Sequence, residues 1–182
     1  MIDLETMSTA PDAAIVSIGA VQMDIEKGVG STFYRVIDLQ SALDYGGRLD
    51  ASTVMWWMGQ SDAARAAIQG TPPLARLAAM LRDLRQWMAD IGPLDERKVW
   101  GNGAGFDLPI LSSASRRLGQ DTPLWHHWNE RCYRTLKNLF RDCKPREREG
   151  VHHNALDDAM HQAQHWVDIM RHALVTRAGG AA

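Results

Sequence analysis

The first residues of the chain, Met1-Ile2-Asp3-Leu4-Glu5-Thr6, place two carboxylates on a short apolar segment. If this segment is a strand, Asp3 and Glu5 point to the same face, because side chains alternate between faces along a strand. Neighbouring carboxylates repel each other and lose solvation when they are buried. A cation bound between them would offset both costs. The alternative is that they are two solvated charges near a frayed chain end.

Two later segments carry further acidic groups where helices are expected to begin. Asp107 follows the small-residue turn Gly101-Asn102-Gly103-Ala104-Gly105 and Phe106, and in a purely structural role it would cap the next helix. The segment 152–159 reads His152-His153-Asn154-Ala155-Leu156-Asp157-Asp158-Ala159. Capping of a last helix by Asn154 explains part of this pattern. It does not explain Asp158 or the histidines, which are therefore candidates for chemistry.

The composition is that of an ordinary globular protein. The 182 residues are 45% apolar and 23% charged, which suits one domain with a substantial core. The formal net charge is -2, so a nucleic acid would have to be held by a local basic patch or by metal ions. The longest apolar run, residues 13–23, is too short to span a bilayer, and no leader precedes it. We therefore expect a cytoplasmic protein with no membrane partner and with reduced thiols at Cys132 and Cys143.

The order of predicted elements indicates a single α/β domain over residues 1–175 and a disordered tail over 176–182. Strands come first, and the second and third are expected to form an antiparallel hairpin. Helical periodicity begins near residue 39, and leucines at spacings of three and four predict a clear helix over 73–90. The other expected elements are strands over 1–6, 14–26, 31–38 and 98–102, an irregular Trp-rich loop over 120–130, and helices over 108–118, 135–141 and 155–174.

Together, the acidic motifs resemble those of the DEDDh 3'-5' exonucleases, a DnaQ-like group of the ribonuclease H-like superfamily. The similarity extends from residue 2 to about residue 170. It rests on Asp3-x-Glu5, on Asp107 after Phe106, and on His153-x-Ala155-x-x-Asp158. Residues 17–20 (Ser-Ile-Gly-Ala) and 53–57 (Thr-Val-Met-Trp-Trp) resemble a smaller bacterial and phage branch, which groups exodeoxyribonuclease VIII-like domains with a related exoribonuclease domain.

This resemblance implies a mixed five-stranded sheet whose first three strands are antiparallel, flanked by helices. It also implies that Asp3, Glu5, Asp107 and Asp158 hold two divalent metal ions, Mg²⁺ or Mn²⁺, which favour oxygen ligands. His153 would act as the general base, with His152 as the rival for that role. The spacing to Asp158 favours His153.

Several residues near these motifs are candidates for substrate binding. By resemblance, Thr6 and Met7 would line the pocket for the terminal nucleotide, and Asn102 would contact the substrate unless it is only a turn residue. Trp56 and Trp57 are adjacent and would diverge on a helix, so both cannot be core residues. One of them, with Trp57 as our candidate, would stack on a base, unless it packs between helices instead. The basic segment 131–148 is either a track for phosphates or a solvated charged face.

The predicted function is a metal-dependent 3'-5' exonuclease that hydrolyses single-stranded 3' ends to nucleoside 5'-monophosphates, with DNA as the favoured substrate. A 3'-5' exoribonuclease acting on RNA tails or short oligoribonucleotides is the first alternative. A nucleic-acid-binding module without turnover is the second. Two-fold assembly is common among the families that the chain resembles, so a homodimer also stays open.

Overall fold

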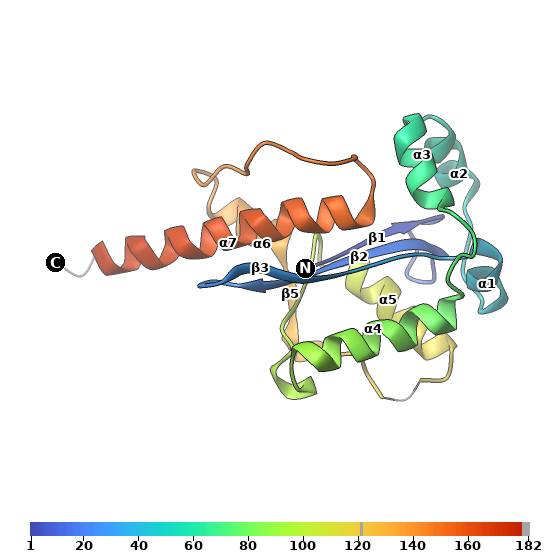
Figure 1. The fold of residues 1–182 in the computed structure, drawn as a ribbon, viewed down its shortest axis with the longest axis horizontal. Coiled ribbons are helices and arrows are strands. Elements are labelled where there is room, and N and C mark those ends of the chain that lie inside the picture. Colours follow the sequence, from blue (N-terminus) through green and yellow to red (C-terminus); the bar gives the residue numbers. More distant parts are fainter. Residues whose placement is uncertain (121, 180–182) are drawn as a thin grey trace.

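The computed structural model describes residues 1–120 and 122–179, which form an α/β fold (Figure 1). An antiparallel hairpin follows the first strand, and every helix that the structure describes comes after it. The elements are β1 (Ile2–Thr6), β2 (Ile15–Asp24), β3 (Gly28–Val36), α1 (Leu39–Asp44), α2 (Ala51–Met58), α3 (Asp62–Gln69), α4 (Leu77–Ile91), β4 (Val99–Gly101), α5 (Asp107–Arg117), β5 (Glu130–Cys132), α6 (Tyr133–Leu139) and α7 (Ala155–Gly179). Short 3₁₀ turns cover Leu94–Glu96 and His127–Asn129.

The strands form two hydrogen-bonded sheets in the described part of the chain. The first is the antiparallel sheet β1-β2-β3, as expected, and the second is the parallel pair β4-β5. One five-stranded sheet was expected instead. The physical reason lies at β1, where the Leu4 N–H donates to the side-chain Oδ1 of Asp107 (3.1 Å). If the two sheets were joined here, a backbone carbonyl of a neighbouring strand would accept this hydrogen bond. In the structure the Asp107 carboxylate accepts it instead.

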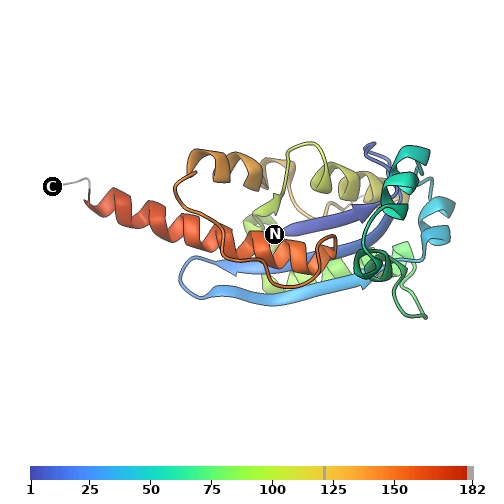
Figure 2. The same cartoon turned by 90° about the horizontal axis from the view of Figure 1, so that it is seen from above.

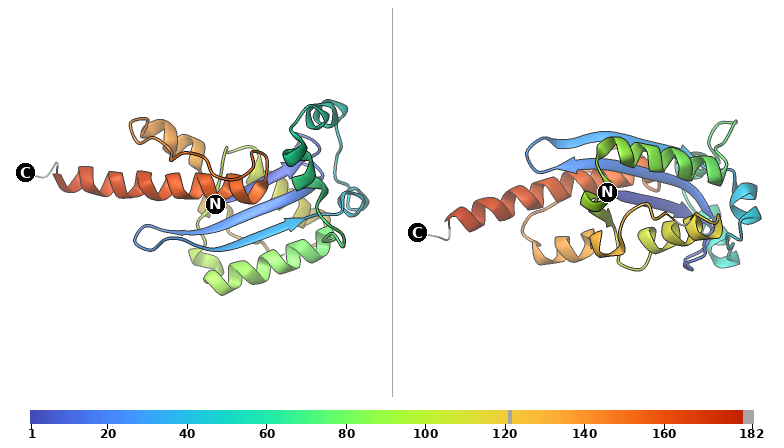
Figure 3. Two further views of the ribbon diagram at one scale, coloured as in Figure 1. Left: turned by 45° about the horizontal axis from the view of Figure 1, so that its top comes forward. Right: turned by 90° about the horizontal axis from the view of Figure 1, so that it is seen from below.

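Helices cover both faces of the antiparallel sheet. Figures 1 and 3 show α7 on one face and α4 and α5 on the other, with α4 over the hairpin and α5 beside β1. The larger core fills the α4 and α5 side and includes Ile18, Leu81 and Leu111, all fully buried. The smaller core joins the sheet to α6 and α7. Seen from above, α7 crosses the strands obliquely and its C-terminal part extends past them (Figure 2).

The start of α4 and the end of α7 differ from expectation. Helix α4 begins at Leu77 rather than at residue 73, because Ala75 is paired with the end of β3. The Ala75 N–H donates to the Val36 carbonyl (3.1 Å), and the Asp38 N–H donates to the Ala75 carbonyl (2.9 Å). Helix α7 continues through Gly179, so the tail expected over 176–182 falls partly on this helix, and its last three residues lie outside the described range.

No helix within the described residues is both long enough and apolar enough to cross a membrane.

Candidate active site

The structure brings the first strand and the last helix together around a cluster of carboxylates. On β1, Asp3 lies opposite Gly19 of β2, and Glu5 lies opposite Ser17. The carboxylate oxygens of Asp3, Glu5 and Asp158 lie within 4.8 Å of one another, although Asp158 is far away in the sequence. Glu5 and Asp158 are buried and Asp3 is half-buried. Three of the four acids that the sequence motifs single out therefore lie together in the structure.

Gly19 lets α7 approach β2 closely enough to complete the cluster. A Cβ atom at position 19 would lie 2.1 Å from the carbonyl oxygen of Ala155 and 2.4 Å from the amide nitrogen of Leu156. Backbone therefore packs on backbone at this point, which only glycine permits. Asp158 lies on the same first turn of α7, so the contact at Gly19 sets how far its carboxylate is from β1.

Asp107 is buried and joins the two sheets. It is the first residue of α5, after the N-cap Phe106, so it is not the capping residue itself. Its Oδ1 accepts from the Leu4 N–H (3.1 Å) and its Oδ2 accepts from the Asn102 N–H (3.0 Å). Asp107 lies outside the group of three oxygens that are within 4.8 Å. Its charge nevertheless acts on Asp3, because it is among the causes that raise the pKa of Asp3.

The cluster is electrostatically unfavourable without a cation. Burial, and then the charges of Asp107 and Glu5, raise the pKa of Asp3 well above its usual range. Burial, followed by Asp158 and Asp107, raises the pKa of Glu5 to about 8. Burial also raises the pKa of Asp107 to about 6, although its backbone donors oppose this change. Raised pKa values at several buried carboxylates are typical of a site that binds positive charge.

The polar groups around the cluster also fit a divalent ion. Gln162, one turn after Asp158 on α7, donates from Nε2 to Asp3 Oδ1 (2.8 Å). Its Oε1, like Asn102 Oδ1, is buried without a hydrogen-bond partner among the described residues. Mg²⁺ and Mn²⁺ take carboxylate oxygens and water as ligands, and unpaired acceptor oxygens can hold such water. The residues present therefore fit the ions that the sequence motifs imply.

His153 borders the cluster in a constrained conformation. Its backbone has φ of 65°, and its N–H donates to Asp158 Oδ2 (3.1 Å). Its ring packs edge-on against Trp56, with centroids 4.9 Å apart, and against His152 at 4.1 Å. Burial, and then His152, lower the pKa of His153 below its usual value. The ring is therefore mostly neutral near pH 7, which is the form that can accept a proton.

His152 is the more exposed of the two histidines. Both rings nevertheless have a nitrogen within 4.8 Å of the Asp158 carboxylate. Both candidates for the base are thus close to this acid.

Trp56 and Trp57 have different environments. Trp57 is only 4% exposed, and its Nε1–H donates to the carbonyl of Thr6 (2.9 Å), so it anchors α2 to the end of β1. Trp56 is 46% exposed and lies beside His153. The stacking role that the sequence suggested for Trp57 therefore suits Trp56 better. Periodicity could not separate two adjacent tryptophans on a helix of eight residues.

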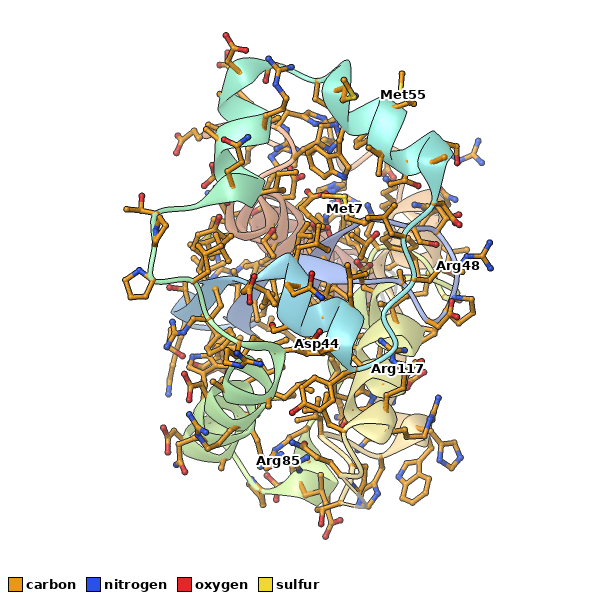
Figure 4. The ribbon with its side chains drawn as sticks, turned by 90° about the vertical axis from the view of Figure 1, so that its right-hand side faces the viewer. Met7, Asp44, Arg48, Met55, Arg85 and Arg117 are labelled. Carbon is orange, nitrogen blue, oxygen red and sulfur yellow. The ribbon has the colours of Figure 1, made fainter. Side chains whose placement is uncertain are left out.

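The other proposed substrate residues lie around the same end of the sheet. Thr6 and Met7 are buried, and the Thr6 hydroxyl donates to the Ser8 carbonyl (2.7 Å). Figure 4 shows Met7 beneath α2, in the middle of the molecule, and Met55 pointing away from the body. Asn102 is half-buried in the loop before α5, next to Asp107. Of these residues, Asn102 keeps an unpaired acceptor at the site.

Several cations of the basic segment contact the protein itself. Arg134 donates to the Asn102 carbonyl (2.8 Å), and Arg146 forms a bidentate pair with Asp168 (2.7 and 2.8 Å). Arg148 pairs with Asp158. Sequence reasoning did not identify Gln162, and it named Arg148 only as one cation of the basic segment. The position of Gln162, four residues after Asp158 on a helix, was a usable signal.

Comparison with known proteins shows to which family the chain belongs. None of the curated proteins compared with the chain matches it. The model of the family described as "3'-5' exoribonuclease Rv2179c-like domain" matches residues 1–170, which include the acidic cluster, His153 and most of α7. Since this match covers nearly the whole chain, the protein belongs to the Rv2179c-like family of 3'-5' exoribonuclease domains.

Proposed function

We propose that the protein is a metal-dependent 3'-5' exoribonuclease of the DEDDh, DnaQ-like type, releasing nucleoside 5'-monophosphates from single-stranded 3' ends. The observation that carries this proposal is the cluster of Asp3, Glu5 and Asp158 oxygens within 4.8 Å, beside His153. In this proposal Asp3, Glu5, Asp107 and Asp158 hold two divalent ions, Mg²⁺ or Mn²⁺.

The residues of the chain divide the work between binding and proton transfer. When bound, the ions would supply Lewis-acid stabilisation of the charge that develops on the scissile phosphate and the leaving 3'-oxygen. His153 would accept the proton of the attacking water through its neutral ring, and the hydrogen bond from its N–H to Asp158 fixes its backbone at the site. Trp56, exposed beside it, would offer a face to a terminal base.

RNA replaces DNA as the favoured substrate. The sequence motifs alone favoured DNA and kept RNA as the alternative, whereas the matched family is one of exoribonuclease domains. This match supports the alternative better than the DNA reading.

The test uses matched RNA and DNA oligonucleotides, each labelled at the 5' or the 3' end, with Mg²⁺, Mn²⁺ or EDTA. We expect RNA to be shortened from its 3' end one nucleotide at a time, faster than DNA, and only with a divalent ion. Asp3→Asn should reduce the rate by at least about 100-fold, because it removes a charge that the site needs. Asp90→Asn, the same change at an exposed position of α4, should leave the rate unchanged.

Two results would overturn the proposal. One is shortening from the 5' end. The other is turnover that persists in EDTA and in Asp3→Asn. RNA binding without any turnover under these conditions would instead support the binding-module alternative.

A further inference from the structure

Arg148 places a positive charge at the edge of the acidic cluster. It lies in the loop between α6 and α7, and its guanidinium pairs with Oδ1 of Asp158. The other oxygen of the same carboxylate accepts from the His153 N–H. Both oxygens of Asp158 are thus already bonded within the chain, although this residue belongs to the group whose oxygens lie within 4.8 Å. A divalent ion at Asp158 would therefore compete with Arg148.

The loop holds Arg148 near the site whether or not it is bonded to Asp158. On one side, Arg146 is paired in bidentate fashion with Asp168 of α7. On the other side, the Val151 N–H donates to Asp157 Oδ2 (2.7 Å). Gly150, at φ of 83°, packs against the same Asp157 carboxylate, which a Cβ would approach to 2.5 Å. The backbone is anchored on both sides, so the long side chain can change partner without moving away from the cluster.

The charge balance changes when ions are bound. Before binding, the guanidinium pairs with Asp158, whose charge is among the causes that raise the pKa values of Asp3 and Glu5, and this pair offsets part of that charge. Two divalent ions would neutralise four carboxylates, and Arg148 would then face like charges at short range. The phosphodiester of a bound RNA is a monoanion with oxygens that a guanidinium binds in bidentate fashion. It offers Arg148 a new partner in the same place.

We propose that Arg148 exchanges partners. It forms an ion pair with Asp158 in the ion-free protein, and it binds a phosphate of the 3'-terminal nucleotides once ions are bound. This inference rests on the proposed function. It assigns to one residue both a competition with the metal and a contact with the substrate. Its role as a phosphate ligand explains why a positively charged side chain lies at a site that binds metal ions.

The first experiment measures Mn²⁺ binding by isothermal titration calorimetry without RNA, in the wild type, Arg148→Gln and Arg82→Gln. Arg148→Gln should bind Mn²⁺ about 5-fold more tightly, because a partly exposed competing ion pair is lost. Arg82→Gln is the matched control, because it removes an exposed cation of α4, on the opposite face of the sheet, and its Mn²⁺ affinity should equal that of the wild type. Thermal unfolding of each variant verifies that it is folded.

The second experiment measures binding of RNA with a non-hydrolysable 3'-terminal linkage by fluorescence anisotropy, with Mn²⁺ at saturation. Arg148→Gln should weaken binding about 10-fold through loss of a charge-assisted phosphate contact. It should also lower the salt dependence of log K by about 0.7, the value for one phosphate contact on a single strand. Arg148→Lys should recover part of both effects, whereas Arg82→Gln should match the wild type.

The outcomes separate this inference from the proposed function. Unchanged Mn²⁺ affinity in Arg148→Gln overturns the competition, and unchanged RNA affinity and salt dependence overturn the phosphate contact. In both cases the proposed function stands if the wild type binds Mn²⁺ and Asp3→Asn does not. Absence of Mn²⁺ binding in the wild type overturns both proposals.

Discussion

Replacement of Gly19 by alanine should separate the two halves of the acidic cluster. The new Cβ would lie 2.1 Å from the Ala155 carbonyl oxygen, whereas tight contacts of real Cβ atoms lie at 3.0–3.4 Å. Because packed backbone cannot interpenetrate, the first turn of α7 must move away from β2 by roughly 1 Å. Asp158 lies on that turn and moves with it, away from Asp3 and Glu5.

The size of the effect differs between stability and activity. Overpacking of this kind costs about 1–3 kcal/mol of unfolding free energy, as in other cores forced to accept an extra methyl group. In the ion-free protein part of that cost is offset, since the carboxylates that repel one another move apart. A misplacement of about 1 Å at a catalytic site can lower the rate on the order of 100-fold. Activity should therefore fall much further than stability.

The assay compares thermal unfolding with and without Mn²⁺, together with the rate of RNA shortening. The wild type should gain stability from Mn²⁺ by the mass-action relation for a ligand that binds only the folded state. Gly19→Ala should lose most of that gain. Gly92→Ala is the control, because a Cβ there meets nothing within 4 Å and the backbone is extended. If Gly19→Ala kept the wild-type response to Mn²⁺ and the wild-type rate, the close approach of α7 would not be what positions Asp158.

Two further predictions concern single residues of the site. Glu5 has its pKa raised from 4.5 to about 8 in the folded protein, so its protonation stabilises the fold below pH 4.5, and this contribution is lost as the pH rises through 8. In EDTA, we therefore expect Glu5→Gln to gain stability relative to the wild type as the pH rises from 5 to 8.5. The gain in unfolding free energy, measured with urea, should reach about 4 kcal/mol. A difference that stays constant or shrinks as the pH rises would contradict the burial of this charge. Trp56→Ala should weaken RNA binding by about 1–3 kcal/mol through loss of a stacked base, with little change in melting temperature. Trp57→Phe should change RNA binding little and cost about 1–3 kcal/mol of unfolding free energy, because the Thr6 carbonyl loses its buried donor. Equal effects of the two substitutions on RNA binding would contradict the distinction between these tryptophans.

Local patterns in the sequence predicted the elements that carry the carboxylates. Alternation placed Asp3 and Glu5 on one face of β1, and helical periodicity predicted both α4 and α7. Patterns of this kind could not show that backbone contact at Gly19 sets the position of α7. Nor could they show that the Asp107 side chain takes the place of a strand carbonyl at β1. These are contacts between segments far apart in the sequence, and neither contact produces a periodic pattern of residues.

The same limit explains the residues that sequence reasoning missed. Arg148 was one of several cations in a basic segment, and only the fold distinguishes it from Arg146 by placing their partners at Asp158 and Asp168. Trp56 and Trp57 differ only in which of them faces the sheet. In each case the sequence gives the residue types, and tertiary packing decides which residue lies beside the cluster.

The chain order of the site has a consequence for folding. The cluster joins residues 3 and 5 to residue 158, so it exists only when the first strand and the last helix are both in place. Ions bound at this cluster would therefore favour the folded state over the unfolded chain, in which these acids are far apart. The repulsion that raises the pKa values of Asp3 and Glu5 opposes that same assembly in the ion-free protein. The ion pair between Arg148 and Asp158 reduces this repulsion at the edge of the cluster. The close contact of α7 with Gly19 keeps Asp158 near Asp3 and Glu5. A protein built in this way should lose stability when ions are removed, and it should lose more when Arg148 is also replaced.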